Sequence, residues 1–251
     1  MWLAARRAAA SCFLGSAVSR KAMLSIISPE ILHRLQPVYE RTLAKPVRQL
    51  FFMDVIRQTG EFKTLAWNGV PIWRRSYDDW TTTETIQAVQ PMLIIETGTH
   101  VGGSALYFAN LLDLIGQGRV ISMDVEDRHQ RDHPRIEFLI GDSTSEERVL
   151  EVRTAAEDCG GAVLVILDSD HRAEHVLREM EAYGPAVTPG SYMLVQDGLI
   201  DVVATMRQPY PGPLHGIKQF LSRHPEFEVD EQRCNQFLIT YHPMGWLHRL
   251  Q

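Results

Sequence analysis

Residues 91–112, PMLIIETGTHVGGSALYFANLL, contain the change of pattern that decides the fold. An apolar run ends in a carboxylate, a turn rich in glycine follows, and a second apolar stretch begins. This order predicts a buried strand over residues 92–96 and a helix over residues 103–115. Such a junction presents backbone N–H groups and the positive end of a helix, and it is therefore expected to hold a ligand.

Strands and helices alternate through the rest of the chain. The predicted strands are RVISMD (119–124), IEFLIGD (136–142), AVLVILDSD (162–170), SYMLVQDG (191–198) and, as an antiparallel end, FEVD (227–230) and QFLITYHP (236–243). The predicted helices span residues 145–158, 172–187 and 213–224. Continuous apolar strands separated by helices indicate an α/β fold, a mostly parallel sheet with helices on both faces.

Two segments precede this sheet. Residues 1–28 hold four basic residues and no acid, while the remainder holds 21 basic and 31 acidic residues. We expect a disordered N-terminal segment, which is either a mitochondrial presequence or a frayed bacterial N-terminus or upstream start. Residues 29–90 are expected to form a helical cap region. The spacing of Ile31, Leu35, Val38 and Leu43 predicts helix from Pro29 to about Gly60. A loop, WNGVPIWRRSYDDW (67–80), is expected next, with Asp78 or Asp79 capping the helix that follows. Residues 91–251 are expected to form the ligand-binding domain.

Composition narrows the class of protein. A net charge of −6 and a pI near 5.9 argue against a nucleic-acid binder. No apolar run approaches the length of a membrane span, so no membrane partner is expected. Three widely spaced cysteines favour a reducing compartment and argue against a disulfide framework. These features predict a cytoplasmic protein, or a mitochondrial one if the N-terminus is a presequence.

Polar side chains gather where the five parallel strands end. Because parallel strands end at one edge of the sheet, these side chains are expected to line a common binding site. The strand-end residues are Glu96 and Gly98, Asp124, Asp142, Asp168 with Asp170 and His171, and Gln196 with Asp197.

The first strand end reads E-x-G-x-x-x-G-G-S. This pattern lacks the glycine spacing of a dinucleotide fold, and its acid would repel a pyrophosphate. A carboxylate suits a ligand with cationic groups, such as S-adenosylmethionine, although a plain tight turn would also need glycine. The candidate cofactor contacts in this loop are Glu96, Gly98, Thr99, Gly102 and Ser104.

Two further acids could contact an adenosine. Asp124 ends the second strand, where a carboxylate can accept hydrogen bonds from ribose hydroxyls. Asp142 lies where the adenine edge could meet a carboxylate, with an N-cap of the following helix as the alternative. Both are candidate cofactor-binding residues, and Asp124 by itself does not distinguish S-adenosylmethionine from NAD.

The fourth and fifth strand ends favour a metal. Asp168, Gln196 and Asp197 offer two carboxylates and an amide oxygen, which suit Mg²⁺. A helix cap is the alternative for Asp168, and a half-buried structural amide is the alternative for Gln196. His171 could be a general base, a metal ligand or a solvent-facing residue.

Several motifs together resemble one family. GVPIW…YDDW, LIIETGTHVGGSALYFA, VILDSDHRAEHVLREM, PGSYMLVQDG and FLITYHPMGWLHR are similar to the cephalosporin hydroxylase / rhamnosyl O-methyltransferase family, from about Gly69 to the end. The resemblance implies a Rossmann-like class I fold that uses S-adenosylmethionine and Mg²⁺. It implies cofactor contacts at Glu96, Gly98 and Asp124 and metal ligands at Asp168, Gln196 and Asp197. The family carries glutamate where this chain has Gln196.

The expected function is therefore Mg²⁺-assisted O-methylation of a small-molecule hydroxyl, such as that of a sugar, a phenol or a secondary metabolite. Related catechol-type enzymes carry a lysine base at the position of His171, so His171 and Asp168 are the candidate catalytic residues. Trp73, Tyr77 and Trp80 either wall the acceptor pocket or pack in the core. An NAD-dependent oxidoreductase and a non-catalytic binding protein are the alternatives, and self-association is left open.

Overall fold

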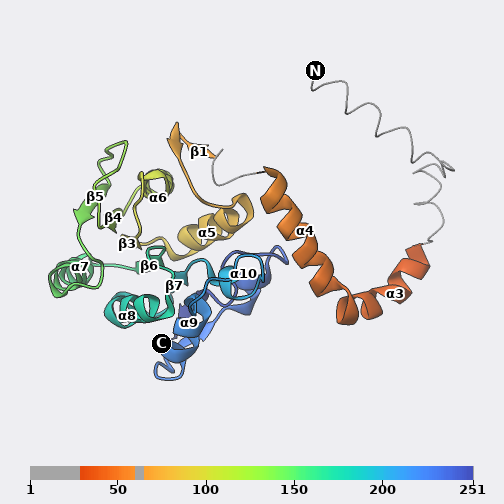
Figure 1. The fold of residues 1–251 in the computed structure, drawn as a ribbon. Coiled ribbons are helices and arrows are strands. Elements are labelled where there is room, and N and C mark those ends of the chain that lie inside the picture. Colours follow the sequence, from red (N-terminus) through yellow and green to blue (C-terminus); the bar gives the residue numbers. More distant parts are fainter. Residues whose placement is uncertain (1–28, 60–64, 251) are drawn as a thin grey trace, which may run out of the picture. The chain divides into compact units, whose positions relative to one another are not determined.

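The computed structural model describes residues 29–59 and 65–250 (Figure 1). The chain divides into two compact units, Met1–Leu50 and Phe51–Gln251. The predicted disordered segment, residues 1–28, lies outside the described residues, as does Cys12. Cys159 and Cys234 are both free thiols. None of the described helices combines the length and the apolar character that a membrane crossing requires.

The helical pattern predicted from Pro29 to about Gly60 corresponds to two helices. Helix α3 spans Pro29–Thr42, and α4 spans Ala44–Thr59. Leu43 stands between them in a turn. The apolar side chains that gave α3 its helical spacing, Ile31, Leu35 and Val38, are about half exposed.

A short hairpin and one helix lead into the sheet of the second unit. Strands β1 (Ala66–Trp67) and β2 (Val70–Pro71) pair antiparallel where a loop was expected. Helix α5 spans Ser76–Val89, and neither Asp78 nor Asp79 is its N-cap. That prediction was wrong because the N-cap is Arg75, three residues before Asp78, which places both acids in the first turn of the helix.

The sheet has seven strands in the order β5-β4-β3-β6-β7-β9-β8 (Figure 1). Its first five strands are parallel, and β9 pairs antiparallel with both β7 and β8. The strands are β3 (Leu93–Thr97), β4 (Arg119–Asp124), β5 (Ile136–Ile140), β6 (Val163–Leu167), β7 (Tyr192–Val195), β8 (Phe227–Val229) and β9 (Trp246–Arg249). The strand order reverses between β3 and β6, and this is the position at which open α/β sheets bind ligands.

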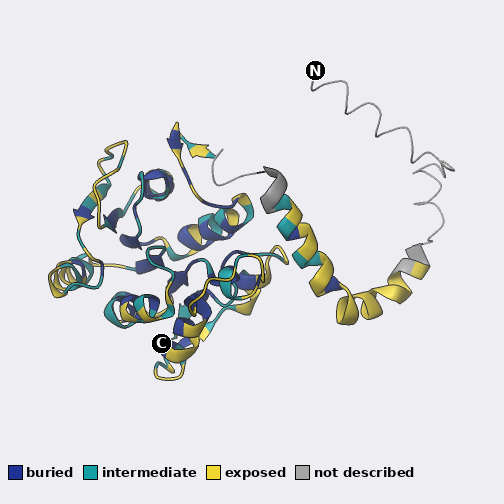
Figure 2. Cartoon of the chain, in the orientation of Figure 1, coloured by how far each residue is buried: buried dark blue, intermediate teal, exposed yellow. Residues whose placement is uncertain are grey.

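Helices cover both faces of this sheet, as predicted. They are α6 (Gly103–Ile115), α7 (Glu146–Asp158), α8 (Ala173–Tyr183), α9 (Pro213–Leu221) and α10 (Glu231–Asn235). Alternate residues of a strand serve opposite faces: Ile95 belongs to the core with Met180 of α8, whereas Ile94 belongs to the core with Phe108 of α6. Figure 2 shows the buried residues concentrated along the strands and the inner sides of these helices.

The end of the chain departs from the prediction. Residues 236–243 form turns and irregular structure, and the last strand is β9 instead. Within the predicted strand, Phe237 and Leu238 are 41% and 58% exposed, whereas Trp246 and Leu247 of β9 are buried. The irregular segment is held by Asp78, which accepts hydrogen bonds from the Thr240 hydroxyl at 2.7 Å and the Tyr241 backbone N–H at 3.1 Å.

Candidate active site

The predicted site residues do meet at one edge of the sheet. Thr97 of β3 is in register with Met123 of β4 and with Leu167 of β6, and Leu167 is in register with Val195 of β7. The residues that follow these positions therefore emerge side by side. They are Gly98, Asp124, Asp168 and Gln196.

Gly98 is required by the close approach of two strand ends. Its φ is +89°, and a Cβ there would lie 2.0 Å from the carbonyl oxygen of Asp168. Its backbone N–H donates to Met123 at 2.8 Å, which fixes the start of the loop on β4. The glycine predicted as a cofactor contact thus also joins the cofactor loop to the strand that carries Asp168.

The other end of the loop opens α6. Gly102 is its N-cap, with φ of +84°, and no side chain caps the helix. A Cβ on Gly103 would lie 2.1 Å from the carbonyl oxygen of Pro71, so the hairpin segment packs directly on this helix end. Ser104 is half-buried and lines a cleft beside this end of the helix.

Glu96 is fully buried beneath the loop. Its Oε2 accepts from the Ser122 hydroxyl at 2.6 Å, and Ser122 is in turn 2.6 Å from the Thr99 hydroxyl. Burial raises the pKa of Glu96 to about 7, against the hydrogen bonds from Ser104 and Ser122 and the charge of Arg74. Oε1 of Glu96 makes no further hydrogen bond among the described residues. Because a carboxylate oxygen can accept more than one hydrogen bond, a donor such as an ammonium group could also bind here.

Asp124 closes the loop through its carboxylate. Oδ2 accepts from the His100 backbone N–H at 2.7 Å, and Oδ1 accepts from the Glu126 backbone N–H at 3.3 Å. Each oxygen has a second lone pair, so these contacts leave room for hydroxyl donors. The predicted ribose role fits this position.

Asp142 has a local structural role. Its Oδ1 accepts from both the backbone N–H and the hydroxyl of Thr144 at 2.8 Å, and these bonds lower the pKa of Asp142. The N-cap of α7 is Ser145, which accepts from the Arg148 backbone N–H. Asp142 thus shapes the turn before α7 without capping it, and its contact with a cofactor stays a prediction.

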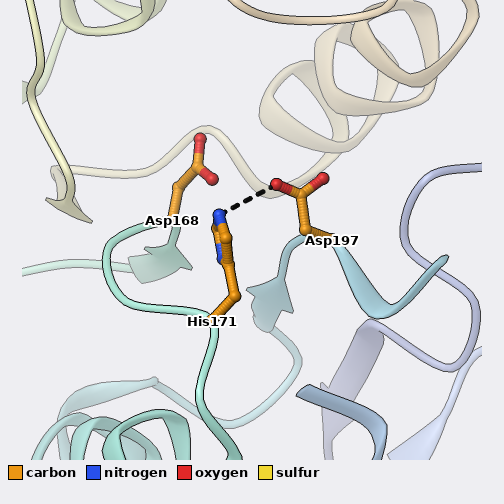
Figure 3. Close-up of side chains that lie close together, drawn as sticks. All are labelled: Asp168, His171 and Asp197. Carbon is orange, nitrogen blue, oxygen red and sulfur yellow. Dashed lines mark ion pairs between the residues drawn. The ribbon is translucent and has the colours of Figure 1, made fainter. Parts of the chain in front are cut away.

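Asp168, His171 and Asp197 form a compact cluster, drawn in Figure 3. One ligand atom from each residue lies within 4.8 Å of the others. His171 Nε2 is 3.1 Å from Asp197 Oδ2, and the two side chains are 33% and 26% exposed. The cluster brings together two residues predicted as metal ligands and the histidine predicted as a base.

The two aspartates of the cluster disfavour each other's charge. Burial raises the pKa of Asp168 well above its usual value, and the nearby Asp197 raises it further. Burial also raises the pKa of Asp197, although His171, Arg74 and Arg75 oppose that shift. A bound cation would relieve this repulsion, because it stabilises both carboxylates in their charged form.

Gln196 is 4% exposed and directly precedes Asp197. Its backbone N–H continues the pairing with Leu167 at 3.0 Å, and its side-chain nitrogen has no hydrogen-bond partner in the described part of the chain. A buried amide N–H is normally hydrogen-bonded, so this one marks a place where a further hydrogen-bond acceptor would be accommodated.

A narrow cleft opens beside the loop. Its walls are Pro71, Ile72, Trp73, Arg74, Gly98, Thr99, His100, Gly103, Ser104 and Asp168. The Trp73 ring is 56% exposed and lies 4.5 Å, centroid to centroid, from the His100 ring. Of the three aromatics predicted to wall an acceptor pocket, Trp73 lines this cleft, whereas Tyr77 packs against Phe52.

Three buried groups near the site were not predicted. Arg74 is 4% exposed and forms an ion pair with Asp79. Fully buried His242 accepts through Nδ1 from the Asp197 backbone N–H at 3.1 Å. Asp78, which anchors the 240–241 segment, has its pKa raised to about 7, chiefly by burial. The charged residues of WRRSYDDW (73–80) were the sequence signal for Arg74 and Asp78, whereas no pattern singled out His242.

Comparisons with known proteins place this geometry in a family. The model of the rhamnosyl O-methyltransferase/CmcI family matches residues 60–250. A rhamnosyl O-methyltransferase of Mycobacterium tuberculosis is 34% identical over 225 residues, which cover 83% of this chain and 92% of the relative. The chain belongs to this family. The rhamnosyl O-methyltransferase of Mycobacterium leprae is 31% identical over 193 residues, covering 75% of this chain and 84% of the relative.

Membership of the rhamnosyl O-methyltransferase/CmcI family confirms the predicted enzyme class, an S-adenosylmethionine-dependent O-methyltransferase. It does not favour the NAD-dependent or non-catalytic alternatives. A CmcI structure described as a complex with Mg and SAM superposes with a TM-score of 0.61 at 18% identity and covers 76% of this chain and 78% of that one. A CmcI structure without ligands gives 0.60 at 19% identity, with the same coverage. These similarities confirm the class I fold.

Proposed function

We propose that this enzyme transfers the methyl group of S-adenosylmethionine to a hydroxyl of a small-molecule acceptor, with Mg²⁺ bound at the acid cluster. The observation that carries the proposal is the cluster of Asp168, His171 and Asp197 directly beside the Gly98 loop, at the reversal of strand order. The methyl donor and the acceptor oxygen would thus meet over the ends of β3, β6 and β7.

The residues of the loop fit the proposed cofactor. S-adenosylmethionine carries a sulfonium, an ammonium, a carboxylate and two ribose hydroxyls. The buried carboxylate of Glu96 keeps lone pairs that the ammonium could use, and Asp124 keeps lone pairs for the ribose. Because S-adenosylmethionine has no phosphate, Glu96 before the loop would not repel it as it would repel a pyrophosphate.

The cluster fits the proposed metal. Asp168 and Asp197 would hold Mg²⁺, with the adjacent Gln196 amide as a further oxygen donor, and these are the ligand types that Mg²⁺ prefers. The bound ion would supply the positive charge that lowers the pKa of an acceptor hydroxyl. Burial raises the pKa of both aspartates, and the charge of Asp197 adds to the shift of Asp168, so a bound cation would favour the ionised form of both.

His171 would remove the proton of the acceptor. An Nε2–H donated to Asp197 leaves Nδ1 with its lone pair, and this nitrogen would then take the proton. Asp197 would also orient the imidazole, as a carboxylate does for other catalytic histidines. Holding oxygen, methyl carbon and sulfur in line would contribute much of the acceleration.

The first acceptors to test are rhamnosides, because the curated mycobacterial relatives are named rhamnosyl O-methyltransferases. Trp73 beside the cleft offers an exposed aromatic face on which a sugar ring can stack. A cytoplasmic location and the mitochondrial alternative stay predictions from composition, and oligomeric state is a matter for a sizing experiment.

The testing experiment is methyl transfer from radiolabelled S-adenosylmethionine to rhamnoside, phenol and macrolide acceptors, with Mg²⁺ or a chelator. We expect transfer to one acceptor class that depends on Mg²⁺. Asp168→Asn should abolish turnover, whereas the matched control Asp170→Asn should not, since the contacts of Asp170 are local, with the backbone N–H and the guanidinium of Arg172. Failure to bind S-adenosylmethionine, or binding of NAD in its place, would refute the proposal.

His171 requires a separate variant, because the cluster also allows it to be a metal ligand. If His171 is the base, His171→Gln should lose turnover. The Mg²⁺ concentration at which half of the cofactor-loaded protein has bound the ion should stay within about twofold of wild type. A loss of Mg²⁺ binding in this variant would make His171 a ligand and would leave the proton to another acceptor.

A further inference from the structure

Arg74 lines the cleft together with residues of the cofactor loop and Asp168, and only part of its guanidinium is hydrogen-bonded. Nε pairs with Asp79, and Nη2 donates to the Thr82 hydroxyl at 3.1 Å. The guanidinium carbon lies 5.1 Å from the centre of the Phe108 ring. Burial disfavours its charge, but the Asp79 carboxylate leaves the pKa of Arg74 above its usual value. Arg74 is therefore a fixed, buried cation.

Nη1 of Arg74 is buried and has no acceptor among the described residues. Leaving a charged donor unsatisfied is costly, and such a group normally marks a missing partner. Because Arg74 also lines the cleft beside Gly98, Thr99 and Ser104, an acceptor that entered the cleft could reach it. The missing partner would carry negative charge, since charge-assisted bonds to arginine are the strong ones.

The charged residues at the cleft suit both ends of an amino acid. The acids Glu96 and Asp168 suit an ammonium and would repel a carboxylate. Arg74 is the single permanent cation among the residues that line the cleft, so a carboxylate in the cleft would be stabilised only by a direct contact with Arg74.

We propose that Arg74 binds the α-carboxylate of the methionyl group of the cofactor. The proposal rests on the proposed function, since it takes S-adenosylmethionine as the ligand. Arg74 would then hold the amino-acid end of the donor while Asp124 holds the ribose, and these two contacts would set the position of the sulfur between them. A competing role is charge balance alone, because Arg74 also favours the ionised forms of Glu96 and Asp168.

The test is calorimetry with two ligands that differ only in the carboxylate. S-adenosylhomocysteine is compared with S-adenosyl-3-thiopropylamine, which is the same molecule without that group. Wild type should bind S-adenosylhomocysteine about 10- to 100-fold more tightly, the range of a hydrogen bond between charged groups. In Arg74→Gln this ratio should fall to near one. Roughly equal losses for both ligands would assign Arg74 to charge balance and overturn the proposal.

Two further variants keep the result interpretable. Arg74→Gln combined with Asp79→Asn replaces the buried ion pair by a neutral pair, so Asp79 is not left as an unpaired charge. Arg233→Gln is the matched control: Arg233 also pairs with an aspartate and lies over an aromatic ring, but it is not part of the cleft. It should leave both affinities unchanged.

The wild-type ratio can still overturn the proposal if every Arg74 variant fails to fold. If wild type binds S-adenosylhomocysteine and its decarboxylated analogue equally well, no residue of the site contributes binding energy through the carboxylate. This would overturn the inference while the proposed function stands. If wild type binds neither ligand but binds NAD, the proposed function itself fails.

Discussion

Replacing Gly98 by alanine tests the junction between the cofactor loop and the metal-site strand. The substitution has two separate costs. Alanine in a left-handed conformation, at φ of +89°, costs about 1–2 kcal/mol. Its Cβ would also lie 2.0 Å from the Asp168 carbonyl oxygen, about 1.3 Å inside the roughly 3.3 Å at which carbon and carbonyl oxygen normally meet. Displacing packed structure by that much costs about 1–3 kcal/mol more.

Two other glycines separate these costs. Gly116 has φ of +86° with nothing within 4 Å of its Cβ position, so Gly116→Ala measures the backbone term alone. Gly118 has φ of +84° and a Cβ position 2.3 Å from the Pro91 carbonyl oxygen, so Gly118→Ala adds a clash outside the site. We expect urea unfolding to give losses of about 1–2 kcal/mol for Gly116→Ala and about 2–5 kcal/mol for the other two.

Cofactor affinity then separates Gly98 from Gly118. Gly98→Ala should weaken S-adenosylhomocysteine binding at least tenfold, because the loop must move away from the end of β6. Gly118→Ala, equally strained but distant in the fold, should bind within about threefold of wild type while it is folded. If Gly98→Ala is no less stable than Gly116→Ala, the close approach of the two strand ends is wrong.

Three further predictions concern the metal ligands and the groups that support them. Gln196→Glu should lower the Mg²⁺ concentration for half-maximal methyl transfer about tenfold, or roughly 1.4 kcal/mol. In a chelator it should lower the melting temperature, because the new carboxylate is repelled by its neighbours. An unchanged titration would place Gln196 outside the metal site. His242→Leu removes the acceptor of the Asp197 N–H and should raise the Mg²⁺ concentration for half-maximal methyl transfer about 10- to 100-fold. His242→Asn should restore part of the affinity for Mg²⁺. Equal effects of the two substitutions would mean that His242 acts only through packing. The folded-state pKa of Asp78 is raised to about 7, so the folded state binds the extra proton and the contribution of Asp78 to stability falls as pH rises from about 4 to 7. Wild type should therefore lose stability relative to Asp78→Asn over that interval, as measured by the free energy of unfolding. A gain in stability relative to Asp78→Asn would contradict the raised pKa.

The parallel strands and their acidic ends could be predicted from sequence because both signals are local. Residues 92–95 and Val163–Leu167 are continuous apolar runs, and each is followed at once by an acid, Glu96 or Asp168. In a parallel sheet, such residues share an edge whatever the exact packing. The meeting of Asp168 with Asp197 followed from that rule, without knowledge of any side-chain contact.

The support of the site could not be predicted, because it depends on contacts between distant parts of the chain. Asp78 is an ordinary first-turn acid until Thr240 and Tyr241, more than 160 residues later, supply its donors. The same contacts hold residues 240–241 within an irregular segment, although the apolar and aromatic residues of QFLITYHP favoured a strand. Only the three-dimensional arrangement shows that the next apolar pair, Trp246 and Leu247, takes that place in the sheet.

The most direct measurement is a Mg²⁺ titration of radiolabelled methyl transfer to a rhamnoside, with wild type and Asp168→Asn followed in parallel. We predict that wild-type turnover rises from background in a chelator to saturation with Mg²⁺, and that Asp168→Asn stays at background while it still binds S-adenosylhomocysteine. Full wild-type turnover in the chelator, or normal turnover by Asp168→Asn, would contradict the account of the cluster as a metal-dependent methyl-transfer centre.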